Sequence, residues 1–245
     1  MQEAIAEKHP EMSQVGPGIG DILEKISALE PDSDKAIEIL LKAVDYQAKA
    51  LLELRGYQMF EGFMENHWVN ISGRLPRIKN PRLVYPKLLK RLYQLMETFP
   101  DYRKYQDFEI QIKRSYAWFL VSSPCHTTDD YEEAAEIAKS ALIFKNDDEK
   151  MLRTLGMAQY RSGLFTEALK TIESASLMDQ PGGLAFLAMC QFKLNKKDEA
   201  MESFNRLIKA MEKPSFSNDE ESRNFFREAS NLIQPMTIPE QPFQN

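Results

Sequence analysis

Two stretches of this chain resemble each other at a fixed separation of 32 residues. Residues 152–175 read LRTLGMAQYRSGLFTEALKTIESA, and residues 184–207 read LAFLAMCQFKLNKKDEAMESFNRL. The matched pairs are Leu155 with Leu187, Gly156 with Ala188, and Ala168 with Ala200. A repeat of this length is the signature of a fold in which one supersecondary unit stacks on the next.

A third, less regular copy precedes these two. The segment DYEEAAEIAKSAL at residues 130–142 matches the second half of the next copy at a separation of 34, which pairs Ala141 with Ala175. Its expected first half, around Tyr116 and Ala117, lies too far upstream. This spacing indicates an insertion in the turn at residues 124–128, so the repeat extends over three consecutive units.

Each copy predicts two short amphipathic helices that cross closely where small residues meet. Gly156 and Ala168 are the small residues of one copy, and Ala188 and Ala200 are those of the next. Larger residues such as Leu155 fill the space around each crossing. One helical hairpin cannot bury its apolar face alone, so neighbouring hairpins must stack on one another.

Helical periodicity also continues outside the repeats. Apolar residues recur at helical spacing at residues 34–54, 83–98 and 108–122, and no stretch alternates as a half-buried strand would. We therefore predict an all-α chain. Residues 73–86 carry three prolines and cannot form one regular helix. The glycines at residues 16–20 predict a turn before the next helix.

The spacing of the repeat resembles that of the tetratricopeptide repeat (TPR). The positions that carry the resemblance are Leu152, Leu155, Gly156, Gly163, Phe165, Ala168, Ile172 and Ala175. The resemblance implies a right-handed α-solenoid of helix–turn–helix repeats with a C-terminal capping helix. The segments YAWFLVSSP, LRTLGMAQYRSGLFTEAL and LAFLAMCQFKLNKKDEAM also resemble the C-terminal TPR region of planctomycete-type bacterial multidomain proteins. In that group the repeats often follow a serine/threonine protein kinase domain, whose catalytic motifs are absent from this sequence.

These patterns divide the chain into four expected parts. They are an N-terminal helical region of degenerate TPR-like repeats (residues 1–83), a TPR array (84–211, clearest at 149–180 and 181–212), a capping helix (213–234) and an extended proline-containing tail (235–245). The end of a solenoid needs a cap. Phe225, Phe226, Ala229 and Leu232 have the spacing to dock on the repeat that contains Phe204.

The charge of the chain argues against general nucleic-acid binding. It has 31 Lys and Arg against 37 Asp and Glu, a net charge of −6, whereas nucleic-acid binders are usually basic. Residues 71–114 are an exception, with 11 basic and 4 acidic residues. The first twelve residues are polar and no apolar run could span a membrane, so we expect a cytoplasmic protein without a membrane partner.

No group of residues predicts catalysis, a metal site or a cofactor. His9, His67 and His126 are not spaced as metal ligands, and Cys125 and Cys190 form no CxxC motif. Carboxylate pairs lie in charge-rich helix starts, where a solvated face explains them. We therefore expect no catalytic residues, no metal and no cofactor.

The first helix of each TPR unit lines the concave groove that the resemblance implies. The residues expected there are Arg114, Trp118, Lys150, Arg153, Met157, Tyr160, Arg161, Met189, Phe192 and Lys193. This surface is basic, aromatic and methionine-containing, so we expect it to take an acidic peptide. Met157 and Met189 stand where an Asn is expected in TPR domains that bind chaperone tails, so such a tail is not the first expectation.

The sequence therefore predicts a non-enzymatic scaffold that binds a peptide or partner domain in the groove. One alternative is a regulatory module acting with, or derived from, a serine/threonine protein kinase. Another is an RNA-associated helical repeat that uses residues 71–114. Neither the partner nor the oligomeric state is specified by the sequence.

Overall fold

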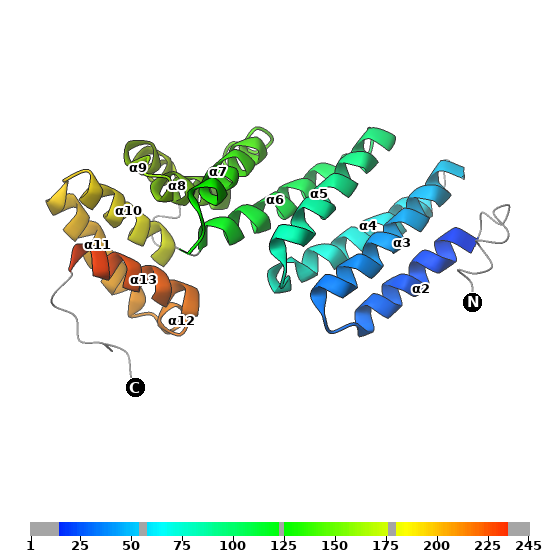
Figure 1. Ribbon diagram of the computed structural model, residues 1–245, viewed down its shortest axis with the longest axis horizontal. Coiled ribbons are helices and arrows are strands. Elements are labelled where there is room, and N and C mark those ends of the chain that lie inside the picture. Colours follow the sequence, from blue (N-terminus) through cyan, green and yellow to red (C-terminus); the bar gives the residue numbers. More distant parts are fainter. Residues whose placement is uncertain (1–14, 54–57, 123–124, 176–179, 235–245) are drawn as a thin grey trace. The chain divides into compact units, whose positions relative to one another are not determined.

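The computed structural model describes residues 15–53, 58–122, 125–175 and 180–234. These residues are helical with short connections and contain no strand (Figure 1). The all-α prediction is confirmed. The chain divides into two compact units, Met1–Ser115 and Tyr116–Asn245, whereas the sequence placed the start of the TPR array at residue 84.

The first unit is built from long helices connected by short turns. Its elements are α2 (Val15–Leu29), α3 (Ser33–Glu53), α4 (Gln58–Arg74), the 3-10 helix η1 (Leu75–Arg77), α5 (Pro81–Thr98) and most of α6 (Lys104–Ser122). Helix α3 packs against both α2 and α4. The largest fully buried side chains of this core are Trp68, Tyr105, Ile37, Leu40, Met64, Ile71, Leu88, Leu92, Leu95 and Ile112.

The expected turn at residues 16–20 is wrong, because α2 begins at Val15 and includes these glycines. Pro17 lies in the first turn of the helix, where its missing N–H has no helical partner to lose. Gly20 is buried, and a Cβ there would lie 3.2 Å from Nε2 of His67 and 3.5 Å from the carbonyl oxygen of Ala43. The glycine therefore permits α2 to approach α3 and α4 closely, and this packing outweighs its low helix propensity.

The proline-containing stretch at residues 73–86 is not one regular helix, as expected. It contains the end of α4, the 3-10 helix η1 and the start of α5, which has Pro81 in its first turn and Pro86 inside it. The hydroxyl of Tyr85 donates a hydrogen bond of 3.1 Å to the carbonyl of Leu75 and so ties α5 to η1. Helix α5 starts at Pro81, two residues before the periodic segment that the sequence analysis found at residues 83–98.

The second unit consists of shorter helices. Its elements are the end of α6, α7 (Thr128–Leu142), α8 (Glu149–Arg161), α9 (Phe165–Ser174), α10 (Pro181–Lys193), α11 (Lys197–Met211), α12 (Pro214–Ser217) and α13 (Glu220–Ile233). Helices α8 and α9 form one hairpin, and α10 and α11 form the next. These are the two clearest repeats of the sequence.

The two hairpins turn in the same way. Gly163 and Asn195, which are 32 residues apart, have positive φ angles of 82° and 61°. In both turns the next residue donates its N–H to the carbonyl five positions back, from Leu164 to Gln159 and from Lys196 to Gln191. This left-handed C-terminal cap requires a residue that tolerates positive φ, and Gly and Asn are the usual choices.

Helix α13 packs mainly on α10 and also on α11. The rings of Phe226 and Phe204 are stacked at 5.9 Å, and Phe225 and Ala229 are buried. Asp219 caps the helix by accepting a hydrogen bond of 2.8 Å from the N–H of Ser222. The expected C-terminal capping helix is therefore present, while the expected extended tail at residues 235–245 lies outside the described residues.

The closest crossing in the repeats gives a prediction. A Cβ at Gly156 would lie only 2.4 Å from Cγ1 of Ile172, next to the branch point of that side chain. We expect Gly156→Ala to lower the unfolding free energy by about 1–2 kcal/mol, because overpacking costs more than the helix gains from Ala.

The matched control is Gly62→Ala in α4, where an added Cβ would meet no atom within 4 Å. This substitution should raise the unfolding free energy by about 0.5–1 kcal/mol, the difference in helix propensity. Denaturant titrations of both variants measure the two effects. Gly156→Ala with stability equal to or above that of the parent would contradict the repeat register.

Candidate functional site

Residues from three helices of the second unit converge on α13. They are Trp118 of α6, Arg153 and Arg161 of α8, and Gly182 and Phe186 of α10, which together we call the arginine face. Helices α8 and α10 are the first helices of the two clearest repeats, so the face lies on the side of the repeats that the sequence predicted to be the groove.

Arg153 lies over the ring of Trp118, with its guanidinium carbon 4.8 Å from the ring centroid. The indole N–H of Trp118 donates a hydrogen bond of 2.8 Å to the carboxylate of Glu221 in α13. Burial lowers the pKa of Arg153, and the nearby Glu221 opposes this effect. Nε of Arg153 is buried and has no acceptor among the described residues, so this guanidinium is only partly satisfied.

Arg161 is more completely engaged. Its Nη1 and Nη2 donate to the two carboxylate oxygens of Glu228 at 2.9 and 3.0 Å, and its Nε donates to the carbonyl of Val121 at 2.8 Å. Its guanidinium carbon lies 5.1 Å from the ring centroid of Phe186 and 5.6 Å from that of Tyr131. With a side chain only 5% exposed, Arg161 forms a bidentate ion pair away from bulk water.

Phe225 of α13 lies between these two charged contacts. Its ring centroid is 6.0 Å from that of Trp118 and 5.7 Å from that of Phe186, both in edge-on geometry. A Cβ at Gly182 would lie 3.3 Å from two ring carbons of Phe225, so the glycine lets the ring approach α10 closely. The face therefore combines two cations with an aromatic contact.

The structure brings together some of the residues that the sequence assigned to the groove. Trp118, Arg153 and Arg161 meet at α13. An open depression of about 260 Å³ beside the arginine face is lined by three of the predicted groove residues, Tyr160, Arg161 and Lys193. Its other lining residues are Tyr131, Gly163 and Phe165. Phe192 is half-buried and Lys150 is exposed at the start of α8, while Arg114 belongs to the first unit.

Met157 and Met189 were expected on the groove surface, but both are fully buried. The reason is packing on several sides. Helix α10 contacts α8, α9, α11 and α13, so residues 181–191 are all buried. The two methionines are core residues and offer no surface to a ligand in this structure.

Sequence reasoning missed the acidic side of the site. Glu220 and Glu221 are one of the carboxylate pairs for which the sequence predicted a solvated face, and Glu228 was not singled out. Loss of hydration raises the pKa of Glu221, whereas the hydrogen bond from Trp118 and the charge of Arg153 lower it. The available signal was the spacing of Glu221, Phe225 and Glu228, which places all three on one helical face.

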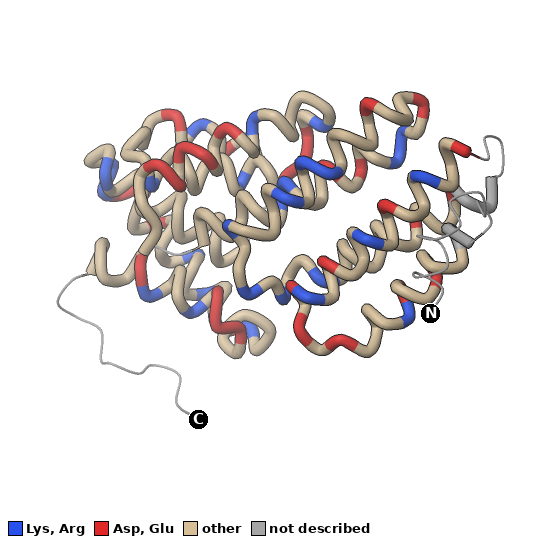
Figure 2. The backbone as a smooth tube through the Cα atoms, turned by 45° about the vertical axis from the view of Figure 1, so that its right-hand side comes forward, with Lys and Arg blue, Asp and Glu red and all other residues tan. Residues whose placement is uncertain are grey.

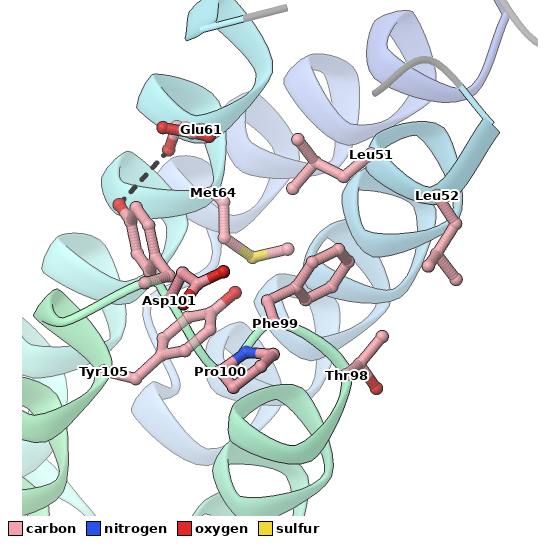
Figure 3. Close-up of a pocket in the computed structure, with 10 residues that line it drawn as sticks. Leu51, Leu52, Glu61, Met64, Thr98, Phe99, Pro100, Asp101 and Tyr105 are labelled. Carbon is pink, nitrogen blue, oxygen red and sulfur yellow. Dashed lines mark hydrogen bonds between the residues drawn. The ribbon is translucent and has the colours of Figure 1, made fainter. Parts of the chain in front are cut away.

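The first unit has its own cavity, with a volume of about 390 Å³ (Figure 3). Its lining includes apolar side chains from the end of α3, from α4 and from the turn before α6, such as Leu51, Met64 and Phe99 in Figure 3. Two carboxylates, Glu61 and Asp101, lie at its exposed rim. No histidine or cysteine is among these lining residues.

The basic stretch at residues 71–114 faces acidic residues of its own unit. Figure 2 shows acidic as well as basic positions on the helices of the chain. The ion pairs are Lys79 with Asp32, Lys87 with Glu38, Arg91 with Asp45, Lys104 with Glu65, and Lys113 with Glu109. These ion pairs reduce the positive potential with which the stretch could attract the phosphates of an RNA backbone.

The described residues contain no group of three His, Cys, Asp or Glu residues placed to hold a metal ion. None of the helices in this part of the chain is long and apolar enough to cross a membrane. Cys190 is buried, and burial raises the pKa of its thiol to about 12, so the thiol stays protonated at neutral pH.

Comparison with known proteins identifies the last hairpin. A family model described as tetratricopeptide repeat matches residues 183–213, which contain most of α10 and all of α11. Among solved structures, the complex of the TPR2AB domain of yeast Sti1 with pHSP90 is similar over 90% of this chain and 99% of that chain, with 18% identity and a TM-score of 0.36. No curated protein matches the sequence.

A buried histidine of the first unit predicts a pH dependence of stability. His67 is 1% exposed, and its Nδ1 lies 2.5 Å from a carboxylate oxygen of Glu24. Burial lowers the pKa of His67 below its usual value, and Glu24 only partly offsets this effect. The folded state therefore keeps the ring neutral at a pH where the unfolded state already binds a proton.

We expect the unfolding free energy to fall as the pH decreases below about 6.5, the ordinary pKa of histidine. The loss should continue until the pH reaches the lowered pKa of the folded state. Chemical unfolding at pH 7.5, 6.5, 5.5 and 5.0 measures it for the parent and for His67→Gln. The His67→Gln variant should lose the part of the pH dependence that comes from His67. If the unfolding free energies of the parent and the variant changed in parallel with pH, His67 would not be the group responsible.

Proposed function

We propose that this chain is a non-enzymatic protein-interaction scaffold whose second unit binds a peptide or partner domain on the arginine face. The observation that carries the proposal is the bidentate contact between Arg161 and Glu228, because it shows that this face accommodates a carboxylate from an amphipathic helix. The tetratricopeptide repeat at residues 183–213 supports the same class of function.

The proposed ligand is acidic and carries at least one aromatic side chain. Arg153 and Arg161 supply positive charge on the face, and Lys193 adds to it from the open depression that Arg161 also lines. Arg is well suited to carboxylates and phosphates because its fork can donate two parallel hydrogen bonds. Trp118 and Phe186 supply the apolar contact. Met157 and Met189 take no part, since both are buried in the repeats.

Two narrower interpretations have weaker support. The first interpretation, a regulatory module of a bacterial, cytoplasmic serine/threonine kinase system, rests on sequence resemblance alone. RNA binding through residues 71–114 is disfavoured by the acidic partners of Lys79, Lys87 and Arg91. Protein binding through the second unit therefore remains the proposal.

The proposal predicts the effect of removing positive charge from the face. In affinity capture followed by identification of the bound protein, Arg153→Gln with Lys193→Gln should weaken partner binding about tenfold or more. Each lost charge-assisted contact is worth roughly 1.5–3 kcal/mol where it is desolvated and less where it is wet. Titration of the identified partner against the parent and the variant gives the two affinities.

The control is Lys170→Gln with Lys209→Gln, which removes two positive charges from exposed positions on the second helices α9 and α11. This variant should bind the partner as the parent does, and circular dichroism should show that both variants are folded. Equal affinity of all three proteins would show that the partner does not use the arginine face.

A further inference from the structure

Helix α13 makes the contacts that the proposed function assigns to an external ligand. We propose that α13 is a tethered, displaceable occupant of the arginine face, and that the external partner is an acidic amphipathic helix that takes its place. This inference rests on the proposed function and specifies its partner and its regulation. Four features of the second unit support it.

Both arginines of the arginine face also have contacts that lie outside α13. Arg153 is supported by the ring of Trp118, a residue of α6. Arg161 is fixed by its hydrogen bond to the carbonyl of Val121 and by the rings of Tyr131 and Phe186. None of these supports belongs to α13, although Glu221 and Phe225 of α13 also contact Trp118.

The segment that connects α13 to the repeats contributes nothing to the core. Helix α11 ends at Met211, and the four residues of α12 include no buried side chain. Lys213, Pro214 and Asn218 are exposed. Helix α13 can therefore leave the arginine face without unfolding the hairpin of α10 and α11.

The contacts of α13 are imperfect. Glu221 accepts from Trp118, and the buried Nε of Arg153 is left without an acceptor among the described residues. Ser230 of α13 is 4% exposed, and its hydroxyl likewise has no partner there. Buried polar groups without partners oppose docking. A helix that brings a carboxylate to Arg153 would satisfy this face better than α13 does, and an apolar residue in place of Ser230 would remove the second of these costs.

The spacing of the contacts defines the partner. Glu221, Phe225 and Glu228 are four and three residues apart, which places them on one face of a helix over about 10 Å. Ala229, fully buried beside Glu228, requires a small residue at the next position. The expected partner helix therefore carries Glu, an aromatic residue four positions later, Glu three positions after that, and then a small residue.

A labelled synthetic peptide of residues 218–234 tests the inference on the full-length protein. The open variant combines Glu221→Gln, Phe225→Ala and Glu228→Gln, which remove the contacts of α13 with the arginine face and change no residue of the repeats. An intramolecular occupant lowers the apparent affinity for a competing ligand in proportion to the fraction of empty sites. The open variant should therefore bind the peptide at least about tenfold more tightly than the parent does.

The matched control combines Glu212→Gln, Phe216→Ala and Glu220→Gln. It has the same three kinds of substitution, with both carboxylates at exposed positions and Phe216 half-buried in α12. The control should bind the peptide as weakly as the parent. A peptide with Gln, Ala and Gln in place of Glu221, Phe225 and Glu228 should not bind the open variant.

Hydrogen exchange provides a second measurement on the unaltered protein, in case the open variant does not fold. Excess peptide should accelerate amide exchange of residues 220–233 in the parent, because it competes with α13. Unchanged exchange at saturating peptide, or a folded open variant that binds no better than the parent, would show that α13 is a permanent cap.

The partner from the affinity capture separates the two hypotheses. If that partner depends on Arg153 and Lys193 but binds the parent and the open variant equally, the inference is wrong and the proposed function stands. If the partner is insensitive to Arg153 and Lys193, the proposed function itself is wrong. Tighter partner binding by the open variant, lost on adding Arg153→Gln, supports both.

Discussion

The close crossing of two helices within each hairpin is the constraint on which the second unit depends. At Gly156 the backbone of α8 lies so near Ile172 that even a methyl group would overlap with it. Ala168, Ala188 and Ala200 are fully buried at the corresponding positions. These small residues fix which side of α8 faces α9. They thereby determine that Arg153 and Arg161 lie on another side, where α6, α10 and α13 meet them.

Helix α10 is packed against other helices on all of its sides. It contacts the helices before it, the helix after it and α13, so it has no solvated face over its first eleven residues. Its sequence, PGGLAFLAMCQFK, is apolar on all sides, which is the pattern of a buried helix. The pair of glycines near its start suits this environment, since Gly182 leaves the space that the ring of Phe225 occupies.

The repeat could be predicted from sequence because its cause is local and periodic. The small residues at the crossings and the left-handed turns at Gly163 and Asn195 recur at 32 residues, and a single hairpin accounts for all of them. The burial of Met157 and Met189 was missed because the prediction treated each first helix as having one solvated face. For Met189, the all-round apolar sequence of α10 indicated otherwise.

The contacts that form the arginine face could not be predicted in the same way. Trp118 and Glu221 are 103 residues apart, and Arg161 and Glu228 are 67 residues apart. No periodic pattern relates these positions, because each pair depends on how many helices stack between its members. The sequence did locate Trp118, Arg153 and Arg161 on one side of the repeats. It did not indicate that the chain itself supplies the carboxylates.

The desolvated arginines explain why a carboxylate has to be present on this face. Arg161 is almost fully buried, and breaking a buried ion pair by removing one partner costs about 3–5 kcal/mol, because a charge is left uncompensated. A helix docked here without a carboxylate would therefore be unfavourable, and α13 provides Glu228 to avoid this cost. Arg153 is different, since α13 leaves its buried Nε without an acceptor. The same helix thus satisfies one arginine and only partly satisfies the other, and this asymmetry gives a competing acidic helix its advantage at Arg153.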